Sequence, residues 1–281
     1  MKGLTTSNQF KNFLNKYQHP SDEICEKHNC HKVVFDLPKP HTVCEQCQQE
    51  AINTRSNNIV KSSVSRIERR KSYGVLTKDS LIPDDDLKDA SFSTFNPNDD
   101  ESSNNLRIAK LSAKKFLEDA KFNLILSGPP GRGKSHLALS ILKAVNEQSQ
   151  GKITCMFINT DDLFFKIRDS WSNKDNGFTA PEVISRLSKV DLLVLDDLGS
   201  EATMQSRYVE AKDYIQQPLY EVLRKRSRKS TIITTNMDSE KLNATYNGKI
   251  ISRVLKGVTA NPKEQVIKFT SATADKRILG F

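Results

Sequence analysis

The sequence predicts an α/β fold in which a parallel sheet flanked by helices carries a phosphate-binding loop, preceded by a small zinc-binding N-terminal domain. Three observations support this fold class. From residue 104 onward, short apolar segments alternate with helical patterns. Residues 128–135 read Gly-Pro-Pro-Gly-Arg-Gly-Lys-Ser, and four of the five cysteines lie within residues 25–47.

Strand-like runs and helical patterns alternate along the C-terminal part of the chain. The strand-like runs are residues 122–127, 153–158, 191–196, 230–235 and 265–269. The helical patterns are residues 106–120, 135–148, 160–171, 180–188 and 210–227. Almost wholly apolar strands between helices are typical of a parallel sheet that is covered on both faces. Right-handed crossovers then place the carboxyl ends of the strands, and the ligand, at one edge of the sheet.

Residues 128–135 match the phosphate-loop pattern GxxxxGK[ST] between an apolar run and a helical stretch. Glycines allow backbone amides to turn toward phosphate oxygens, and the following helix presents its positive N-terminus. We expect Lys134 to reach the β- and γ-phosphates and the Ser135 hydroxyl to help bind Mg²⁺. The expected nucleotide-binding residues are Gly128, Pro129, Pro130, Gly131, Arg132, Gly133, Lys134, Ser135 and Asp196. The sequence therefore predicts binding of a nucleoside triphosphate, taken as ATP.

Two carboxylates follow the apolar strand within Asp191–Gly199, which reads DLLVLDDLG. At the carboxyl edge of the sheet, Asp196 is expected to hold Mg²⁺ through water. Asp197 is expected to orient or deprotonate the water that attacks the γ-phosphate. A strand that runs into an acidic turn is the structural alternative.

A third polar position follows the run Ser230–Met237, which reads STIITTNM. The amide of Asn236 at the tip of this strand is expected to hydrogen-bond the γ-phosphate or the attacking water. An asparagine that ends a strand is also common in turns, so this motif alone is not specific.

The order of these motifs resembles AAA+ ATPases of the DnaC/DnaI/IstB branch, from about residue 76 to the end of the chain. The resemblance rests on GPPGRGKSHLA, KVDLLVLDDLG and IITTNM. It implies an AAA+ P-loop NTPase domain in which Asn236 is the sensor-1 residue. Asp197, Asn236 and Arg253 would then be the catalytic residues of a Mg²⁺-dependent ATPase.

The resemblance also implies an arginine finger that acts on the nucleotide of a neighbouring subunit, and therefore a homo-oligomer. Arg253, in Ile-Ser-Arg-Val-Leu, is the matching position. A surface arginine on an amphipathic helix is the alternative. Near the C-terminus the family often has a G-x-S-Y-R-like element. The corresponding run Ser271–Arg277 lacks its glycine and tyrosine, so Arg277 matches a sensor-2 residue only loosely.

The cysteine cluster has the spacing of a zinc site. Two short Cys/His segments separated by a hairpin-length spacer can supply four tetrahedral ligands. The expected ligands are Cys25, His28, Cys44 and Cys47, a CxxH followed by CxxC, which resembles many phage-encoded members of the DnaC/DnaI/IstB branch. Cys30 and His31 compete with His28 for one position. A closed four-ligand site is structural, because a small segment with few apolar residues needs a metal to fold.

Other parts of the chain suggest domain limits. We expect an N-terminal zinc-binding, partner-binding domain at 1–75, a linker at 76–103 and the ATPase domain at 104–281. Residues 1–18 resemble a short helix, and Cys155 is expected to be an inert core residue. The basic helix 219–229 is expected to be solvated or to contact a DNA backbone.

Charge and hydropathy limit the possible partners. The chain carries 43 Lys and Arg against 34 Asp and Glu, a net charge of +9. This excess is compatible with a phosphate-rich partner such as DNA, and equally with a role in solubility. No apolar run approaches the roughly 18 residues of a membrane span, and the first residues lack the apolar stretch of a signal peptide. We expect a cytoplasmic protein with no membrane partner.

A zinc-bearing N-terminal domain joined to this branch of ATPase resembles DnaI-type helicase loaders. The resemblance implies an ATP-dependent protein that binds a replicative DNA helicase and single-stranded DNA during replication initiation. Two alternatives stay open: an IstB-type transposition helper ATPase, and a regulatory binding module that holds ATP with little hydrolysis. Asp196, Asp197 and Arg253 favour hydrolysis, and the zinc cluster favours the loader.

Overall fold

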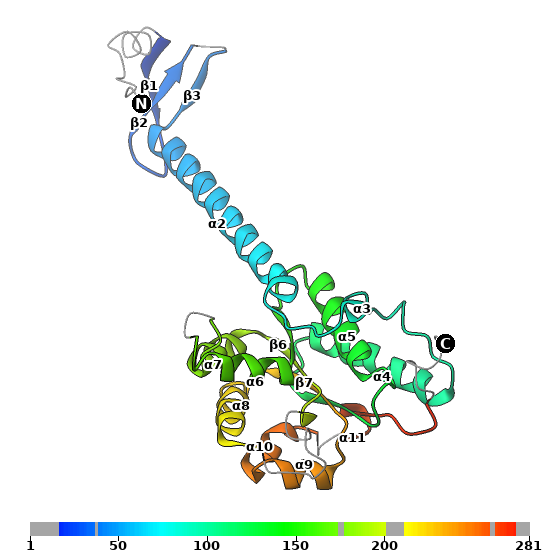
Figure 1. Ribbon diagram of the computed structural model, residues 1–281. Coiled ribbons are helices and arrows are strands. Elements are labelled where there is room, and N and C mark those ends of the chain that lie inside the picture. Colours follow the sequence, from blue (N-terminus) through cyan, green and yellow to red (C-terminus); the bar gives the residue numbers. More distant parts are fainter. Residues whose placement is uncertain (1–16, 37–38, 174–176, 201–210, 259–261, 274–281) are drawn as a thin grey trace. The chain divides into compact units, whose positions relative to one another are not determined.

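The computed structural model describes residues 17–36, 39–173, 177–200, 211–258 and 262–273 (Figure 1). The chain divides into two compact units, Met1–Ile67 and Glu68–Phe281. The dividing point falls within the helix α2 (Glu45–Lys78). The limits 1–75, 76–103 and 104–281 stay a prediction about domains. The helix expected at 1–18 lies outside the described residues as far as residue 16, and a strand already begins at Gln18.

The N-terminal unit contains a three-stranded antiparallel sheet in the order β1-β2-β3, followed by the first part of α2. The strands are β1 (Gln18–Ile24), β2 (His31–Phe35) and β3 (His41–Val43). Among the described residues of this unit, only the side chains of Cys25 and Cys44 are buried. An apolar core of the usual kind is therefore missing from the described part of the unit.

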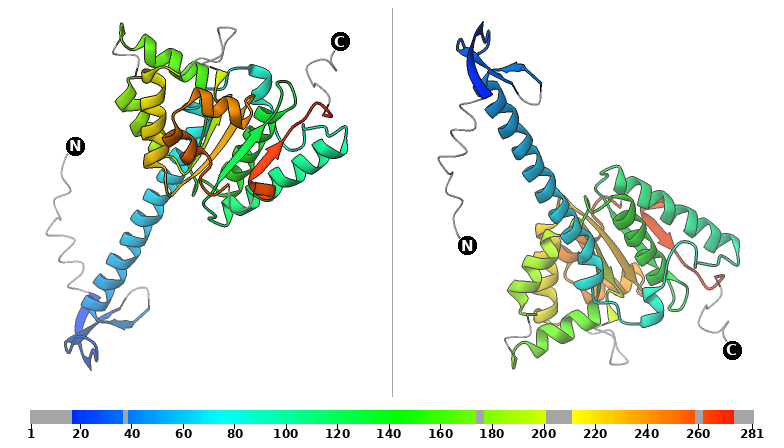
Figure 2. Two further views of the ribbon diagram at one scale, coloured as in Figure 1. Left: turned by 90° about the horizontal axis from the view of Figure 1, so that it is seen from below. Right: turned by 90° about the horizontal axis from the view of Figure 1, so that it is seen from above.

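The C-terminal unit is built on a five-stranded parallel sheet in the order β5-β6-β7-β4-β8. Helices flank this sheet, and β6 and β7 are among its inner strands (Figures 1 and 2). The strands are β4 (Asn123–Ser127), β5 (Cys155–Asn159), β6 (Leu192–Asp196), β7 (Ser230–Thr235) and β8 (Val266–Lys268). The five predicted strands are thus confirmed to within two residues at each end. Because β7 lies between β4 and β6, three loops meet at one edge of the sheet.

Helices cover both faces of this sheet. On one face, α4 (Asp100–Leu117) and α5 (Lys134–Gln148) bury Leu124, Leu126 and the other side chains that point to that face. The opposite face, which includes Ile125, is covered by α6 (Thr160–Asp169), α7 (Ala180–Lys189), α8 (Asp213–Lys225), α9 (Ser239–Thr245) and α10 (Gly248–Val254). Two short helices, α3 (Asp85–Lys88) and α11 (Pro262–Gln265), complete the described elements.

The segment that precedes α4 packs on the sheet. Leu81 adds a short bridge to the free edge of β5, where its N–H donates to the carbonyl oxygen of Phe157 (2.8 Å) and its carbonyl oxygen accepts from Asn159 N–H (3.0 Å). Phe95 is 4% exposed. Residues of the expected linker therefore form part of the structure that surrounds the phosphate loop.

One sequence expectation is wrong for Arg226, which was placed in a solvated or DNA-contacting basic helix. Its side chain is 2% exposed. The guanidinium donates to the carbonyl oxygens of Leu187 (2.9 Å) and Val190 (2.7 Å), and to three further acceptors around the starts of β6 and β7. Burial lowers the pKa of Arg226 to about 9. The Arg226 side chain therefore connects α7 to the sheet and is not accessible to DNA.

Cys155 lies in the core, as expected, because its side chain is fully buried. Burial raises the pKa of this thiol, which keeps it in the unreactive protonated form. Among the residues that the structure describes, no helix combines the length and apolar character needed to span a bilayer.

Candidate functional site

Glycine conformations shape the phosphate loop between β4 and α5. Gly128 and Gly133 have φ angles of +138° and +95°, which residues with a Cβ rarely adopt. A Cβ on Gly128 would lie 2.1 Å from the carbonyl oxygen of Phe269, and one on Gly133 would lie 2.8 Å from the ring of Phe95. The loop therefore requires glycine at both positions.

The loop leads directly into α5, whose first residue is Lys134. Lys134 Nζ donates to the carbonyl oxygen of Pro129 (2.7 Å), so the ammonium group lies across the loop. The first turn of any α-helix has backbone N–H groups without acceptors inside the helix. With the positive end of the helix dipole, these groups make the start of α5 a site suited to phosphate.

Two adjacent carboxylates lie at the carboxyl end of β6. Asp196 is 2% exposed, and Thr234 Oγ1 donates to Asp196 Oδ1 (2.6 Å) while it accepts from Asp197 N–H (2.8 Å). Burial raises the pKa of Asp196, and hydrogen bonds with Thr234 and Ser135 oppose that rise. The Ser135 hydroxyl and the Asp196 carboxylate thus lie together, and such oxygen ligands suit Mg²⁺.

Asn236 directly follows β7, the strand between those of the phosphate loop and the carboxylates. Its Nδ2 donates to Asp197 Oδ1 (2.6 Å). Asp197 has a φ of +59°, which is uncommon for a residue other than glycine. The hydroxyls of Thr160 and Ser200 both donate to the Asp197 carbonyl oxygen and stabilise this backbone (3.1 and 2.7 Å). An amide and a carboxylate therefore lie side by side at the edge of the sheet.

A cavity of ≈ 610 Å³ joins these groups, a volume typical of small-ligand sites. The predicted residues that line it are Pro130, Gly131, Gly133, Lys134, Ser135, Asp196, Asp197 and Asn236. Gly128 and Pro129 form the base of the loop. Arg132 instead donates to the carbonyl oxygen of Thr273, so its guanidinium points toward the C-terminal segment.

Sequence reasoning missed several residues of this cavity, among them Thr234, Asn159 and Asp161. Burial raises the pKa of Asp161, and the nearby charge of Asp197 raises it further. Asn159 is the last residue of β5, and Asp161 follows two positions later. Because the carboxyl ends of parallel strands meet at one edge, this position was the signal that would have found them.

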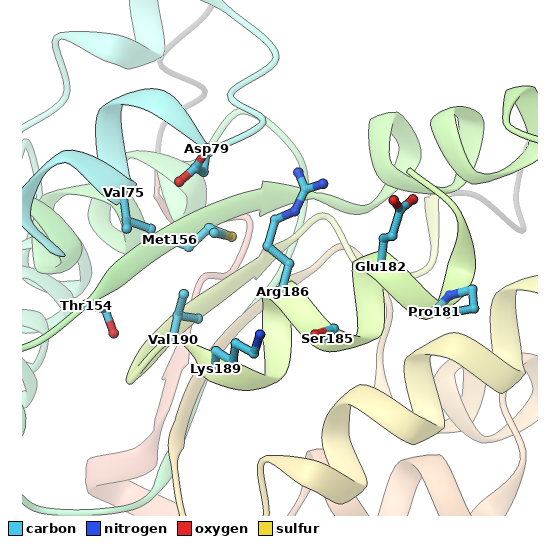
Figure 3. Close-up of a pocket in the computed structure, with 10 residues that line it drawn as sticks. All are labelled: Val75, Asp79, Thr154, Met156, Pro181, Glu182, Ser185, Arg186, Lys189 and Val190. Atoms are coloured by element: carbon cyan, nitrogen blue, oxygen red, sulfur yellow. The ribbon is translucent and has the colours of Figure 1, made fainter. Parts of the chain in front are cut away.

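A second hollow of similar volume, ≈ 600 Å³, lies beside the edge strand β5 (Figure 3). Val75, Met156 and Val190 supply its apolar part, and Glu182 and Arg186 of α7 project along its border. None of the phosphate-loop residues or paired carboxylates lines it. Volume alone therefore does not distinguish the two cavities, whereas the convergent polar groups of the other cavity make it the one suited to phosphate.

Arg253 lies on α10 and does not line the cavity of its own chain. Its guanidinium carbon lies 5.1 Å from the centre of the Tyr220 ring. Arg277 lies outside the described residues, so its expected sensor-2 position stays a prediction.

The structure also brings the four expected zinc ligands together. The ligand atoms of Cys25, His28, Cys44 and Cys47 lie within 4.8 Å of one another. The two sulfur atoms of Cys25 and Cys47 are 3.7 Å apart, and His28 Nδ1 lies 3.3 Å from Cys47 Sγ and 3.5 Å from Cys44 Sγ. A tetrahedral ion with Zn–S bonds of about 2.3 Å has S–S edges of about 3.8 Å, so this donor set fits Zn²⁺.

Neighbouring groups distinguish His28 from its competitors. His28 turns Nδ1 toward the cysteines and Nε2 toward Glu50 Oε1 (3.1 Å), the arrangement in which a carboxylate orients a metal-binding histidine. His31 Nδ1 faces the carbonyl oxygen of Ser21 (3.1 Å). Cys30 Sγ lies 3.5 Å from Cys44 Sγ and borders the group of four.

Comparison with known proteins agrees with this geometry. The sequence profile of the family described as IstB-like ATP binding protein matches residues 46–258. The replicative helicase loader DnaC of Escherichia coli strain K12 is 26% identical over 148 residues, which cover 52% of this chain and 56% of that protein. A putative insertion sequence ATP-binding protein of Sinorhizobium fredii is 35% identical over 115 residues, covering 41% of this chain and 34% of that protein. The chain thus spans about half the length of the DnaC relatives it matches.

Solved structures share the fold. A crystal structure of DnaI is 21% identical with a TM-score of 0.50, covering 70% of this chain and 96% of that one. A putative primosome component from Streptococcus pyogenes serotype M3 is 17% identical with a TM-score of 0.50, covering 70% of this chain and 92% of that one. At these identities the likeness concerns the fold alone.

Proposed function

Because the chain belongs to the family of IstB-like ATP-binding proteins, we propose that it is an ATPase that loads a replicative DNA helicase. The observation that carries the ATPase part is the cavity in which Lys134, Ser135 and two adjacent carboxylates converge. The partner part is supported by the zinc-binding arrangement of the N-terminal unit and by the similarity to proteins named DnaC.

In the proposed reaction, the amides of the phosphate loop and Lys134 bind the β- and γ-phosphates of ATP. Ser135 and Asp196 would hold Mg²⁺, which would supply positive charge to the phosphates. Asp197 accepts a hydrogen bond from the attacking water, and Asn236 keeps that carboxylate in place through the contact of 2.6 Å. Products are ADP and phosphate.

The exposed part of α2 in the N-terminal unit supports binding of a protein partner. Its outward apolar side chains are Ile52, Ile59, Val60, Val64 and Ile67, each 48–60% exposed. At 3.6 residues per turn they fall within about 140° of the helix circumference, with Ser56 and Ser63 between them. This group of exposed apolar side chains, called the stripe below, supports a contact with a partner. The proposed partner is the replicative helicase, with Cys25, His28, Cys44 and Cys47 holding the structural Zn²⁺ of this unit.

A second exposed surface supports binding of single-stranded DNA. Phe165, within α6, and Trp171, two residues after its end, are 61% and 62% exposed. The guanidinium carbon of Arg168 lies 5.5 Å from the centre of the Phe165 ring, and Trp171 packs edge-on against Tyr214. Exposed aromatic rings with neighbouring cations suit unpaired bases and the phosphates that link them.

The proposal is tested by capture of partners from a native host with the full-length protein. We expect a hexameric replicative helicase to be recovered with the unchanged protein and with Asn58→Asp. Recovery should fall strongly with Ile59→Asp, because a charge replaces an apolar contact on the stripe. Equal recovery with both variants would contradict the role of α2, and absence of any helicase would contradict the loader.

An IstB-type transposition helper is the second candidate. The 35% identity to the insertion sequence protein of Sinorhizobium fredii supports it. Capture of a transposase, together with preference for duplex over single-stranded DNA, would favour this candidate. The contact between Asp197 and Asn236 weighs against a third possibility, an ATP-holding module with little hydrolysis, since it orients a carboxylate for water activation.

A further inference from the structure

Arg253, the expected arginine finger, lies over an aromatic ring, and its guanidinium forms no ion pair within 4.0 Å with a carboxylate of the described residues. Its guanidinium carbon lies 5.1 Å from the centre of the Tyr220 ring on α8. Within the described ranges, its side chain has no ion pair within 4.0 Å and no hydrogen bond. A cation over a ring face is stabilised by the ring quadrupole and keeps its full positive charge.

The carboxylate beside Tyr220 is occupied by another arginine. Glu221 accepts from Arg224 Nη2 (2.7 Å) and from Arg224 Nε (3.2 Å). The hydrogen bonds with Arg224 lower the pKa of Glu221, and the charge of Arg253, beyond ion-pair distance, lowers it further. Arg253 is therefore oriented by the ring without being neutralised by a salt bridge, which suits a group that must meet phosphate.

The backbone of Arg253 is fixed from the other side. Asn123 Nδ2 donates to the carbonyl oxygens of Arg253 (2.8 Å) and Val254 (3.1 Å) at the end of α10. Asn123 is 7% exposed and is the first residue of β4. A buried amide thus adds a second donor to the Arg253 carbonyl oxygen, which also accepts from Lys256 N–H, and it sets where the Arg253 side chain begins.

This position is remote from the phosphates of the same chain. Asn123 begins β4 and Ser127 ends it, and a rise of about 3.3 Å per residue separates the two ends by about 13 Å. Arg253 contacts the amino end, whereas the phosphate loop follows the carboxyl end. The expected finger therefore lies away from the phosphate loop of its own chain.

We propose that Tyr220 is a positioning residue that orients Arg253 toward the nucleotide of the neighbouring subunit. The inference rests on the proposed ATPase function and adds a residue that acts only through Arg253. Tyr220 is only partly buried and packs at the border of the core, so its ring is available as a platform. Phenylalanine at this position should still orient Arg253, whereas leucine, which lacks a π-face, should not.

Mixed oligomers test the proposal. One full-length subunit carries Arg253→Ala and keeps its ATP site; the other carries Asp197→Asn and keeps its finger. Each is expected to be inactive alone, and mixing should restore ATPase activity at sites that join the two. Tyr220→Leu is then added to either subunit, and the restored kcat and KM are measured at equal oligomer content.

We expect Tyr220→Leu to lower the restored kcat about threefold to thirtyfold when it is in the finger-bearing subunit. In the Arg253→Ala subunit it should have little effect, because that subunit has no finger to orient. Tyr220→Phe should keep the activity in either subunit. A merely structural role of Tyr220 would impair both placements alike, and that result would overturn the inference.

The outcomes separate this inference from the proposed function. If the two parent subunits assemble but restore no activity, the finger acting between subunits is wrong, and the role of Tyr220 fails with it. If activity is restored and Tyr220→Leu changes neither placement, only the role of Tyr220 is wrong.

Discussion

Two sites of this chain are assembled from distant residues, but different forces hold them. One is the cavity lined by Lys134, Asp196 and Asn236, called the nucleotide cavity below, and the other is the zinc cluster. The phosphate loop, Asp196 and Asn236 follow strands of one sheet, whose two faces are buried in apolar clusters. The described part of the N-terminal unit buries only Cys25 and Cys44. Packing can therefore maintain the first site without its ligand, whereas the second depends on its metal.

Removal of zinc should give the largest difference between the two regions. We expect Cys47→Ser to unfold the N-terminal unit, because a structural zinc supplies on the order of 10 kcal/mol of folding free energy. ATP binding by the C-terminal unit should change less than about twofold, since its packing does not involve the metal. Hydrogen exchange of residues 18–43 and ATP titration of the full-length protein measure the two effects.

Cys30→Ser is the matched control for this experiment. Cys30 borders the cluster at 3.5 Å from Cys44 but lies outside the group of four. The variant should keep about one zinc per chain and normal exchange protection. Loss of zinc with Cys30→Ser and retention with His28→Ala would show that the fourth ligand is Cys30.

A glycine substitution should disrupt the nucleotide cavity and leave the zinc cluster intact. Gly128→Ala places a Cβ 2.1 Å from the carbonyl oxygen of Phe269, so the loop or β8 must move. We expect a loss of ATP affinity of about 100-fold or more, equal to about 3 kcal/mol. Isothermal titration measures the affinity, and metal analysis should show unchanged zinc.

Gly248→Ala is the control for that variant, because nothing lies within 4 Å of the added Cβ. It should bind ATP normally. Normal ATP binding by Gly128→Ala would contradict the close packing of the loop against β8. That result would mean that the geometry of the phosphate loop adjusts to its ligand, as the geometry of the zinc cluster is expected to do.

The two regions also differ in how far the sequence predicted them. The strands were predictable because they are short runs of apolar and β-branched residues between helical patterns, and the phosphate loop because its glycines have fixed spacing. Cys25, His28, Cys44 and Cys47 were predicted from their spacing together with the resemblance to phage-encoded relatives, and the structure groups those four. The expected roles of Asp197, Asn236 and Arg253 stay predictions.

Contacts between side chains of different helices and strands could not be predicted from the sequence. Arg226 belongs to a run of basic residues that reads as a solvated helix end, yet the end of α7 and the starts of β6 and β7 surround it. Thr234 was hidden in a β-rich run, where a hydroxyl that bridges Asp196 and Asp197 looks like any strand threonine. Both depend on which strands become neighbours, and local pattern does not encode that order.

Glu50→Gln should have the smallest effect of these variants, a weaker zinc affinity in one region with no change in the other. Glu50 Oε1 lies 3.1 Å from His28 Nε2, and loss of such a carboxylate weakens metal binding about 10- to 100-fold. Competition with a chelator measures the zinc affinity. We expect ATP affinity to be unchanged, since Glu50 belongs to the N-terminal unit.

Glu26→Gln removes the same charge from an exposed residue near the cluster that does not contact His28 in the described structure. It should leave zinc affinity within about twofold, because an exposed charge in water contributes little. Equal weakening by both variants would mean that net charge, and not the orientation of His28, sets the affinity. If Glu50→Gln leaves the zinc affinity unchanged, then Glu50 does not orient His28 as a metal ligand. Cys30 would in that case be the better candidate for the fourth ligand.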